Sequence, residues 1–166
     1  MGFELDAFLG RTSELRQWKV RLPSAVVCEL SGDLGLVPLT GLLFRELRAR
    51  LGEEADRLDA AQSYPTYPSP SHEEAVRRWG LEASGSTAVA YVSVGEFGNQ
   101  SHEEVTLWSG GREVLSRVKV QTVLDYFRDQ AGLDLGNEPI GFEQHRGEDA
   151  AEKWAAAAGP EGRAGA

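Results

Sequence analysis

The segment from Thr87 to Val94 constrains the fold more than any other part of the chain. It reads Thr-Ala-Val-Ala-Tyr-Val-Ser-Val, so it is rich in β-branched residues and apolar on both faces. A strand of this kind has to be covered on both sides, which places it in the interior of a sheet. The sequence therefore predicts a sheet with further strands on either side of residues 87–94.

Other extended segments can supply those neighbours. Residues 3–9 alternate apolar side chains with acidic or small ones, the period of a half-buried strand. Residues 35–39 are predicted at a sheet edge, because Pro38 cannot donate a hydrogen bond to a strand ladder. The remaining segments are 25–30, 139–146 and the two arms of a hairpin around Ser109-Gly110-Gly111, 105–108 and 113–115. Together they predict a mainly antiparallel sheet of about five strands.

Helical spacing of apolar residues predicts four or five helices beside the sheet. Residues 40–51 carry one apolar stripe behind a threonine cap, and residues 120–131 match helical spacing most closely. Ser71 followed by Glu74 has the pattern of a capping box, which starts a helix that ends near Gly80. The other predicted helices are 12–18 and 148–158.

These elements do not alternate as strand, helix and strand, so the predicted class is α+β. Residues 53–70 are predicted to form a loop, since three prolines in six residues force extended or turn geometry. The length of 166 residues suits one compact domain. We expect this domain to span residues 1–158, followed by a disordered tail at 159–166.

The charge of the chain excludes several classes of partner. There are 26 acidic and 17 basic side chains, which gives a formal charge of -9. Nucleic-acid binding and docking on an anionic membrane both depend on Lys and Arg, so neither is expected. The first residues lack the basic and apolar stretches of a secretory signal, so the expected location is the cytoplasm. Cys28 is the only cysteine, and its apolar surroundings predict a small buried side chain.

A repeated tetrapeptide, Ser-His-Glu-Glu, begins at Ser71 and again at Ser101. Convergence of His72, His102 and a glutamate would make a divalent metal site or an acid–base pair. The first copy is explained by the capping box, and the histidines lack the spacing that places two ligands on one helical face. We therefore expect solvated ends of elements, with no metal and no cofactor.

Two further places can carry function. The Gly95–Ser101 segment brings polar side chains to the end of a buried strand, where loops often bind ligands, although a glycine-dependent turn explains it equally. Its candidate binding residues are Glu96, Asn99 and Gln100. His145 and Arg146 can form a pocket with Trp154, or Arg146 can pair with Glu148 or Glu152 instead.

Several segments taken together resemble a group of small bacterial cytoplasmic proteins with no assigned activity. The resemblance covers most of the chain and is carried by residues 1–5, 35–40, 90–98, 100–108 and 141–146 and by Trp154. The group's glycine-rich turn is shortened here to Phe97-Gly98-Asn99, and the gap from Arg146 to Trp154 is longer. By size and charge alone, such proteins are similar to immunity partners of bacterial toxins.

The acidic residues gather around the prolines. Their simplest interpretation is a solvated face, and their functional interpretation is a surface that steers a basic partner. The candidate residues are Glu53, Glu54, Asp56, Asp59, Glu73 and Glu74. The sequence thus favours a non-enzymatic interaction module, with an immunity-type inhibitor of a basic, toxin-like protein as the specific hypothesis. The alternative is a small-molecule-binding or enzymatic domain that uses the 95–102 loop.

Overall fold

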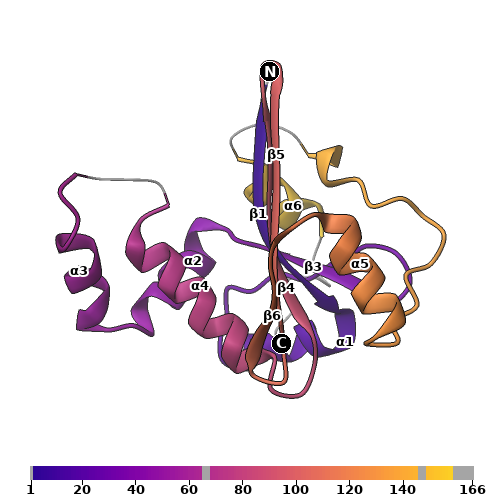
Figure 1. The fold of residues 1–166 in the computed structure, drawn as a ribbon, viewed down its shortest axis with the longest axis horizontal. Coiled ribbons are helices and arrows are strands. Elements are labelled where there is room, and N and C mark those ends of the chain that lie inside the picture. Colours follow the sequence, from indigo (N-terminus) through magenta and orange to yellow (C-terminus); the bar gives the residue numbers. More distant parts are fainter. Residues whose placement is uncertain (1, 65–67, 146–148, 159–166) are drawn as a thin grey trace.

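The computed structural model describes residues 2–64, 68–145 and 149–158, and the fold is built on one antiparallel sheet. Within these residues the sheet has six strands in the order β2-β3-β1-β4-β5-β6. Figure 1 shows it edge-on, with helices on both sides. The strands are β1 (Phe3–Arg11), β2 (Cys28–Glu29), β3 (Leu34–Pro38), β4 (Val89–Phe97), β5 (Gln100–Ser109) and β6 (Arg112–Val118). The α+β class is confirmed, with six strands in place of about five.

The strand predicted from residues 87–94 is β4, and it lies in the interior of the sheet between β1 and β5. The register pairs Val92 of β4 with Ala7 of β1 and with Val105 of β5. Val92 and Val105 are almost completely buried. The apolar character of both faces of this segment thus reflects its central position.

Three of the sequence predictions for strands need correction. Strand β3 lies inside the sheet between β2 and β1, because Pro38 is its last residue and its missing N–H interrupts no ladder. The segment 25–30 contributes only the two residues of β2. Residues 139–146 form no strand among the described residues and contain a short 3-10 helix, η2 (Phe142–Gln144).

Strands β4 and β5 extend further toward each other than predicted and form a hairpin. Strand β4 continues to Phe97, and β5 begins at Gln100, so only Gly98 and Asn99 remain for the turn. Gly98 has a φ of +61°, which glycine adopts without steric cost. The predicted 95–101 loop is therefore a strand end and a tight turn. The second hairpin, around Gly110 and Gly111, is confirmed.

Six α-helices lie in the described residues, together with η2 and a second short 3-10 helix. They are α1 (Thr12–Leu15), η1 (Arg16–Val20), α2 (Gly41–Ala49), α3 (Glu53–Ala60), α4 (Pro70–Ala83), α5 (Val120–Asp129) and α6 (Ala150–Ala157). The predicted Thr40 cap of α2 is confirmed, since its Oγ1 accepts a hydrogen bond from the Leu43 N–H. The predicted tail at 159–166 lies outside the described residues.

Helix α3 was not expected, because the segment 53–70 was predicted to be a loop. The prolines of this segment all come after residue 64, which leaves 53–60 without a helix breaker. Gly52, with a φ of +60°, separates α3 from α2. Acidic side chains in the first turn of α3 interact favourably with the helix dipole, and Ala55 is the buried residue of this helix.

Helix α4 begins two residues earlier than predicted and ends three residues later. Ser69 is its cap, because the Ser69 Oγ accepts a hydrogen bond from the His72 N–H, and Pro70 occupies the first turn. Ser71 is buried inside the helix and is not the cap. Gly80 does not end α4 but lets it approach β5, since a Cβ there would lie 2.4 Å from Cε3 of Trp108.

The two faces of the sheet are covered differently. On one face, α5 and α6 pack Phe127 and Trp154 against the strands. On the other face, α1, η1, α2 and α4 bury a cluster around Phe8, Trp18 and Trp79. Figure 1 shows that α2, α3 and α4 lie beside one part of the sheet, and that the hairpin of β4 and β5 extends beyond them. Among the described residues, no helix covers this part of the second face.

No helix among the described residues has the length and apolar character that a membrane-spanning segment needs.

Candidate functional site

The uncovered part of the sheet is polar, and we call it the open face. Because side chains alternate along a strand, the register places Asp6, Ser93 and Glu104 side by side on β1, β4 and β5. In the next row toward the hairpin turn, Glu4 and His102 flank Gly95. The open face thus consists of Glu4, Asp6, Ser93, His102 and Glu104, and it continues the side of the sheet that buries Phe8.

A cleft of about 660 Å³ runs along the open face to the first turns of α4, and we call it the sheet cleft. Its walls are formed by residues of β1, β4 and β5, of helix α4 and of the outer strand β6. Besides the open face, it is lined by Pro68, His72, Glu73, Val76, Arg77, Tyr91, Thr106, Trp108, Glu113, Ser116 and Arg117.

Carboxylates outnumber cations in the sheet cleft. Glu73 and Glu113 join the three carboxylates of the open face, against the arginines Arg77 and Arg117. Arg117 lies 3.7 Å from Glu104, and both side chains are largely exposed, so this pair contributes little to stability. The cleft therefore presents a net negative charge.

Glu4 shows the electrostatic consequence of this arrangement. Burial raises the pKa of its carboxyl group, the negative charge of Asp6 raises it further, and His102 lowers it in part. No lysine or arginine among the described residues forms an ion pair with Glu4. Ionised Glu4 therefore costs the folded protein free energy at neutral pH.

His72 forms the inner wall of the sheet cleft. Its ring packs against Phe44 with the centroids 5.0 Å apart, and its Nε2 lies 3.3 Å from the hydroxyl of Tyr91. Burial lowers the pKa of His72, although the charges of Asp6 and Glu73 raise it in part. The imidazole is therefore neutral at pH 7 and acts as a hydrogen-bonding wall.

His102 lies above a glycine on the neighbouring strand. A Cβ at Gly95 would come within 2.6 Å of Cε1 of His102, so the ring occupies space that only glycine leaves open. Its Nε2 is 3.4 Å from the Ser93 hydroxyl. Gly95 thus positions His102 on the open face.

Most of the acidic residues proposed from the sequence lie elsewhere and are bound to arginines. Arg48 of α2 contacts Asp56 and Asp59 of α3 at 3.0 and 3.2 Å. Arg78 of α4 contacts Glu54 at 2.6 Å and Glu74 at 2.9 Å. We call Glu54, Asp56, Asp59 and Glu74 the helix acids, because each of them forms an ion pair with an arginine of α2 or α4.

Hydrogen bonds lower the pKa values of two of the helix acids, Asp59 and Glu74. The hydroxyl and N–H of Ser71 donate to Asp59 at 2.7 and 3.0 Å and lower the pKa of its carboxyl group. A hydrogen bond from Arg77 lowers the pKa of Glu74 in the same way. Of the remaining candidates, Glu53 is exposed on α3, and Glu73 lines the sheet cleft.

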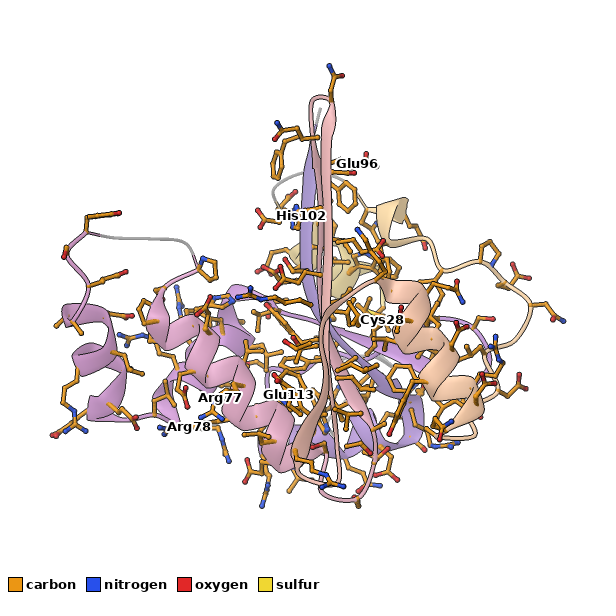
Figure 2. All side chains as sticks on the ribbon, in the orientation of Figure 1. Cys28, Arg77, Arg78, Glu96, His102 and Glu113 are labelled. Atoms are coloured by element: carbon orange, nitrogen blue, oxygen red, sulfur yellow. The ribbon has the colours of Figure 1, made fainter. Side chains whose placement is uncertain are left out.

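The residues proposed from the 95–101 segment do not come together. Figure 2 shows Glu96 and His102 on opposite sides of the strands. Glu96 lines a second cleft of about 920 Å³, which we call the α5 cleft, between the hairpin, α5 and residues 135–142. Asn99 lies in the hairpin turn, and Gln100 is the first residue of β5. His102 also lines the α5 cleft, but Asn99 and Gln100 line neither cleft, so the described residues do not bring Glu96, Asn99 and Gln100 into one site.

Neither cleft is a metal site among the described residues, which contain no group of three His, Cys, Asp or Glu side chains able to hold an ion. Cys28 is buried as predicted, and burial raises the pKa of its thiol to about 11. Its Sγ donates to the carbonyl of Trp154 at 3.4 Å. The thiol is thus protonated at neutral pH and is a poor nucleophile.

The predicted pocket near the end of the chain is seen only in part. His145 packs edge-on against Trp154, with the ring centroids 4.8 Å apart. Glu152 accepts a hydrogen bond from the N–H of Gly41 at 2.9 Å, at the start of α2. The proposed pairing of Arg146 with Glu148 or Glu152 cannot be followed, because Arg146 lies outside the described residues.

Sequence reasoning singled out His102 but missed its neighbours on the open face, Glu4 and Asp6 above all. The signal was present in β1, where Glu4 and Asp6 alternate with Phe3, Leu5 and Ala7. This pattern predicts a polar face but not which strands extend it. The register with β4 and β5 supplies that information.

Comparisons with protein-family models, with curated proteins and with solved structures gave no match to this chain. The resemblance to small bacterial proteins remains an expectation from the sequence.

Proposed function

We propose that this chain is a protein-interaction module that binds a basic partner through the sheet cleft. The observation that carries the proposal is the state of Glu4, which is half-buried beside Asp6 and raised in pKa. A positive group placed between these carboxylates relieves their repulsion. Binding a cation therefore recovers free energy that the isolated protein loses.

The helix acids do not support the same role. Their charges are balanced by Arg48 and Arg78 within the molecule, so a basic partner would have to displace existing ion pairs. The sheet cleft carries an excess of carboxylates over arginines and lies on an uncovered part of the sheet. An acidic surface of this kind also speeds the encounter with a basic protein.

An inhibitor of a nucleic-acid-cleaving toxin is one partner class that fits. The site that such a toxin uses for the phosphate backbone is basic, and an acidic cleft can occupy it. The immunity-type function is therefore proposed with its binding surface moved from the helix acids to the open face. Among the acidic candidates near the prolines, Glu73 lines the sheet cleft.

A titration with an arginine-rich nonapeptide tests the proposal. In ¹⁵N-labelled protein, we expect amide shifts to change along β1, β4 and β5 at the open face and not along α3. The triple variant Glu4→Gln/Asp6→Asn/Glu104→Gln should bind about tenfold more weakly, since each charge pair contributes roughly 0.5 kcal/mol.

The matched control is Glu29→Gln/Glu53→Gln/Glu138→Gln, which removes the same charge at three exposed residues outside the sheet cleft. It should bind the peptide with nearly wild-type affinity. Equal losses in the two triple variants would show that the peptide responds to net charge alone, and the proposed site would be wrong.

A second function, small-molecule binding, is favoured by the α5 cleft. Its lining combines apolar side chains, including Leu124, Ile140 and Phe142, with polar ones such as Glu96 and Ser101. Its size lies within the range of small-molecule sites. Ligand-observed NMR with apolar fragments tests it, with Ile140→Asp as the variant that should abolish binding.

A further inference from the structure

Trp108 leaves one hydrogen-bond donor unsatisfied at the end of the sheet cleft covered by α4. Its side chain is 2% exposed and lines the cleft. The indole Nε1 is buried and has no hydrogen-bond partner in the part of the chain that the structure describes. A buried N–H without an acceptor is costly, and buried tryptophans usually find one.

The fold holds Trp108 at this position. Its six-membered ring lies against Gly80 of α4, where any Cβ would clash. Arg77 and Glu113 line the cleft beside it, and both side chains are exposed. Figure 2 shows these two residues near each other, where α4 meets β6. A ligand that reaches the indole N–H would need these two exposed side chains to change rotamer.

The distance between the two ends of the cleft indicates the shape of the ligand. His102 and Trp108 lie on the same strand, six residues apart, which corresponds to roughly 20 Å. Thr106 and Glu104 lie between them on the same side. An extended peptide of about six residues has this length.

We propose that the binding element of the partner is an extended basic segment that lies along β5. One lysine or arginine side chain sits between Glu4 and Asp6, and a main-chain carbonyl of the segment accepts the hydrogen bond of Trp108. The acceptor has to come from the main chain, because lysine and arginine side chains carry only donors. This inference rests on the proposed function and adds the chemistry of the ligand to it.

The indole resonance of Trp108 tests the inference directly. In ¹³C,¹⁵N-labelled protein, the indole signal is assigned by triple-resonance spectra, and an arginine-rich nonapeptide or spermine is added. We expect the Trp108 indole proton to move downfield with the peptide, because it gains an acceptor. Spermine has positive charges but no carbonyl group, so it should leave this proton in place.

Trp79 is the matched control. It is 3% exposed, and its Nε1 also has no partner among the described residues, but it lines a groove between α2 and α4 outside the sheet cleft. Its indole signal should not respond to the peptide. The variant Trp108→Phe should bind the peptide about fivefold more weakly, as expected for one lost hydrogen bond, while Trp79→Phe should bind it normally.

The outcomes separate the two proposals. If the peptide binds at the open face while the Trp108 signal stays unchanged, the extended-segment inference is wrong and the proposed function stands. A shift of Trp108 with spermine equal to that with the peptide would also overturn the inference. If the peptide does not bind at all, both proposals are wrong. The indole measurement uses the wild-type protein, so it does not depend on the folding of Trp108→Phe.

Discussion

The open face and the helix acids are both acidic, but their charges act in opposite directions on the fold. Asp59 and Glu74 accept hydrogen bonds that lower the pKa values of their carboxyl groups, so their ionised forms stabilise the protein. Glu4 has a raised pKa, so its ionised form destabilises it. Acidic residues that stabilise a fold need no partner, whereas a destabilising one at an uncovered surface is typical of a binding site.

The largest expected effect is that of replacing Gly80, the residue at which α4 packs against Trp108 of β5. In Gly80→Ala, the new methyl group meets the ring of the buried Trp108. We expect a loss of about 3 kcal/mol in the free energy of unfolding, because neither α4 nor the indole can move easily. Urea denaturation measures it. Gly85→Ala is the control, since its Cβ would be no nearer than 3.5 Å to another atom.

The next effect concerns the helix acids. Ser71 is 1% exposed and connects α4 to Asp59 of α3 through two hydrogen bonds, one from its hydroxyl. Ser71→Ala removes the hydroxyl bond and should lower the free energy of unfolding by about 1 kcal/mol. Ser93→Ala on the open face is the comparison, and it should change stability little. A larger loss for Ser93→Ala would contradict the division between the regions.

A smaller effect of opposite sign is expected for Glu4→Gln. Removing the raised carboxylate should increase the free energy of unfolding at pH 7 by about 0.5 kcal/mol, after allowance for solvent screening. The gain should disappear as the pH falls below 4.5, where the carboxyl group is protonated in both the folded and unfolded states. Denaturation of both proteins from pH 4 to pH 7 measures this. A stability gain that persists at pH 4 would show that charge is not the cause.

The smallest effect is the pH dependence that His72 contributes. Its pKa in the folded state lies below the ordinary value of 6.5, so the unfolded chain binds the proton more tightly. Stability should therefore fall as the pH drops from 6.5 to the lowered pKa, and remain level below it. In His72→Gln this part of the pH dependence should vanish. An unchanged curve would mean that His72 is not buried as described.

The sequence was sufficient for elements whose signal is local. The central strand β4, the threonine-capped α2 and the strongly amphipathic α5 follow from residue type and spacing alone. Helix α3 was missed because the prolines after it suggested a longer loop than exists. The interior place of β3 was missed because the effect of Pro38 depends on where the strand ends.

The candidate site was harder to predict, because it depends on register and on coverage. The alternation in β1 shows that Glu4 and Asp6 share a face, but only the pairing with β4 and β5 brings them beside Ser93 and His102. The clustering of acidic residues along the sequence indicated a binding surface around Glu54 and Asp59 instead. Their arginine partners come from α2 and α4, and contacts between helices cannot be read from spacing along the chain.

One measurement tests the division between the two acidic regions most directly. It compares Glu4→Gln/Glu104→Gln on the open face with Glu54→Gln/Glu74→Gln among the helix acids, each measured for urea stability and for affinity to the arginine-rich nonapeptide. The open-face pair should be at least as stable as wild type and bind more weakly, and the helix pair should be less stable and bind normally. The reverse pattern, with binding lost in the helix pair and stability lost in the open-face pair, would contradict the account.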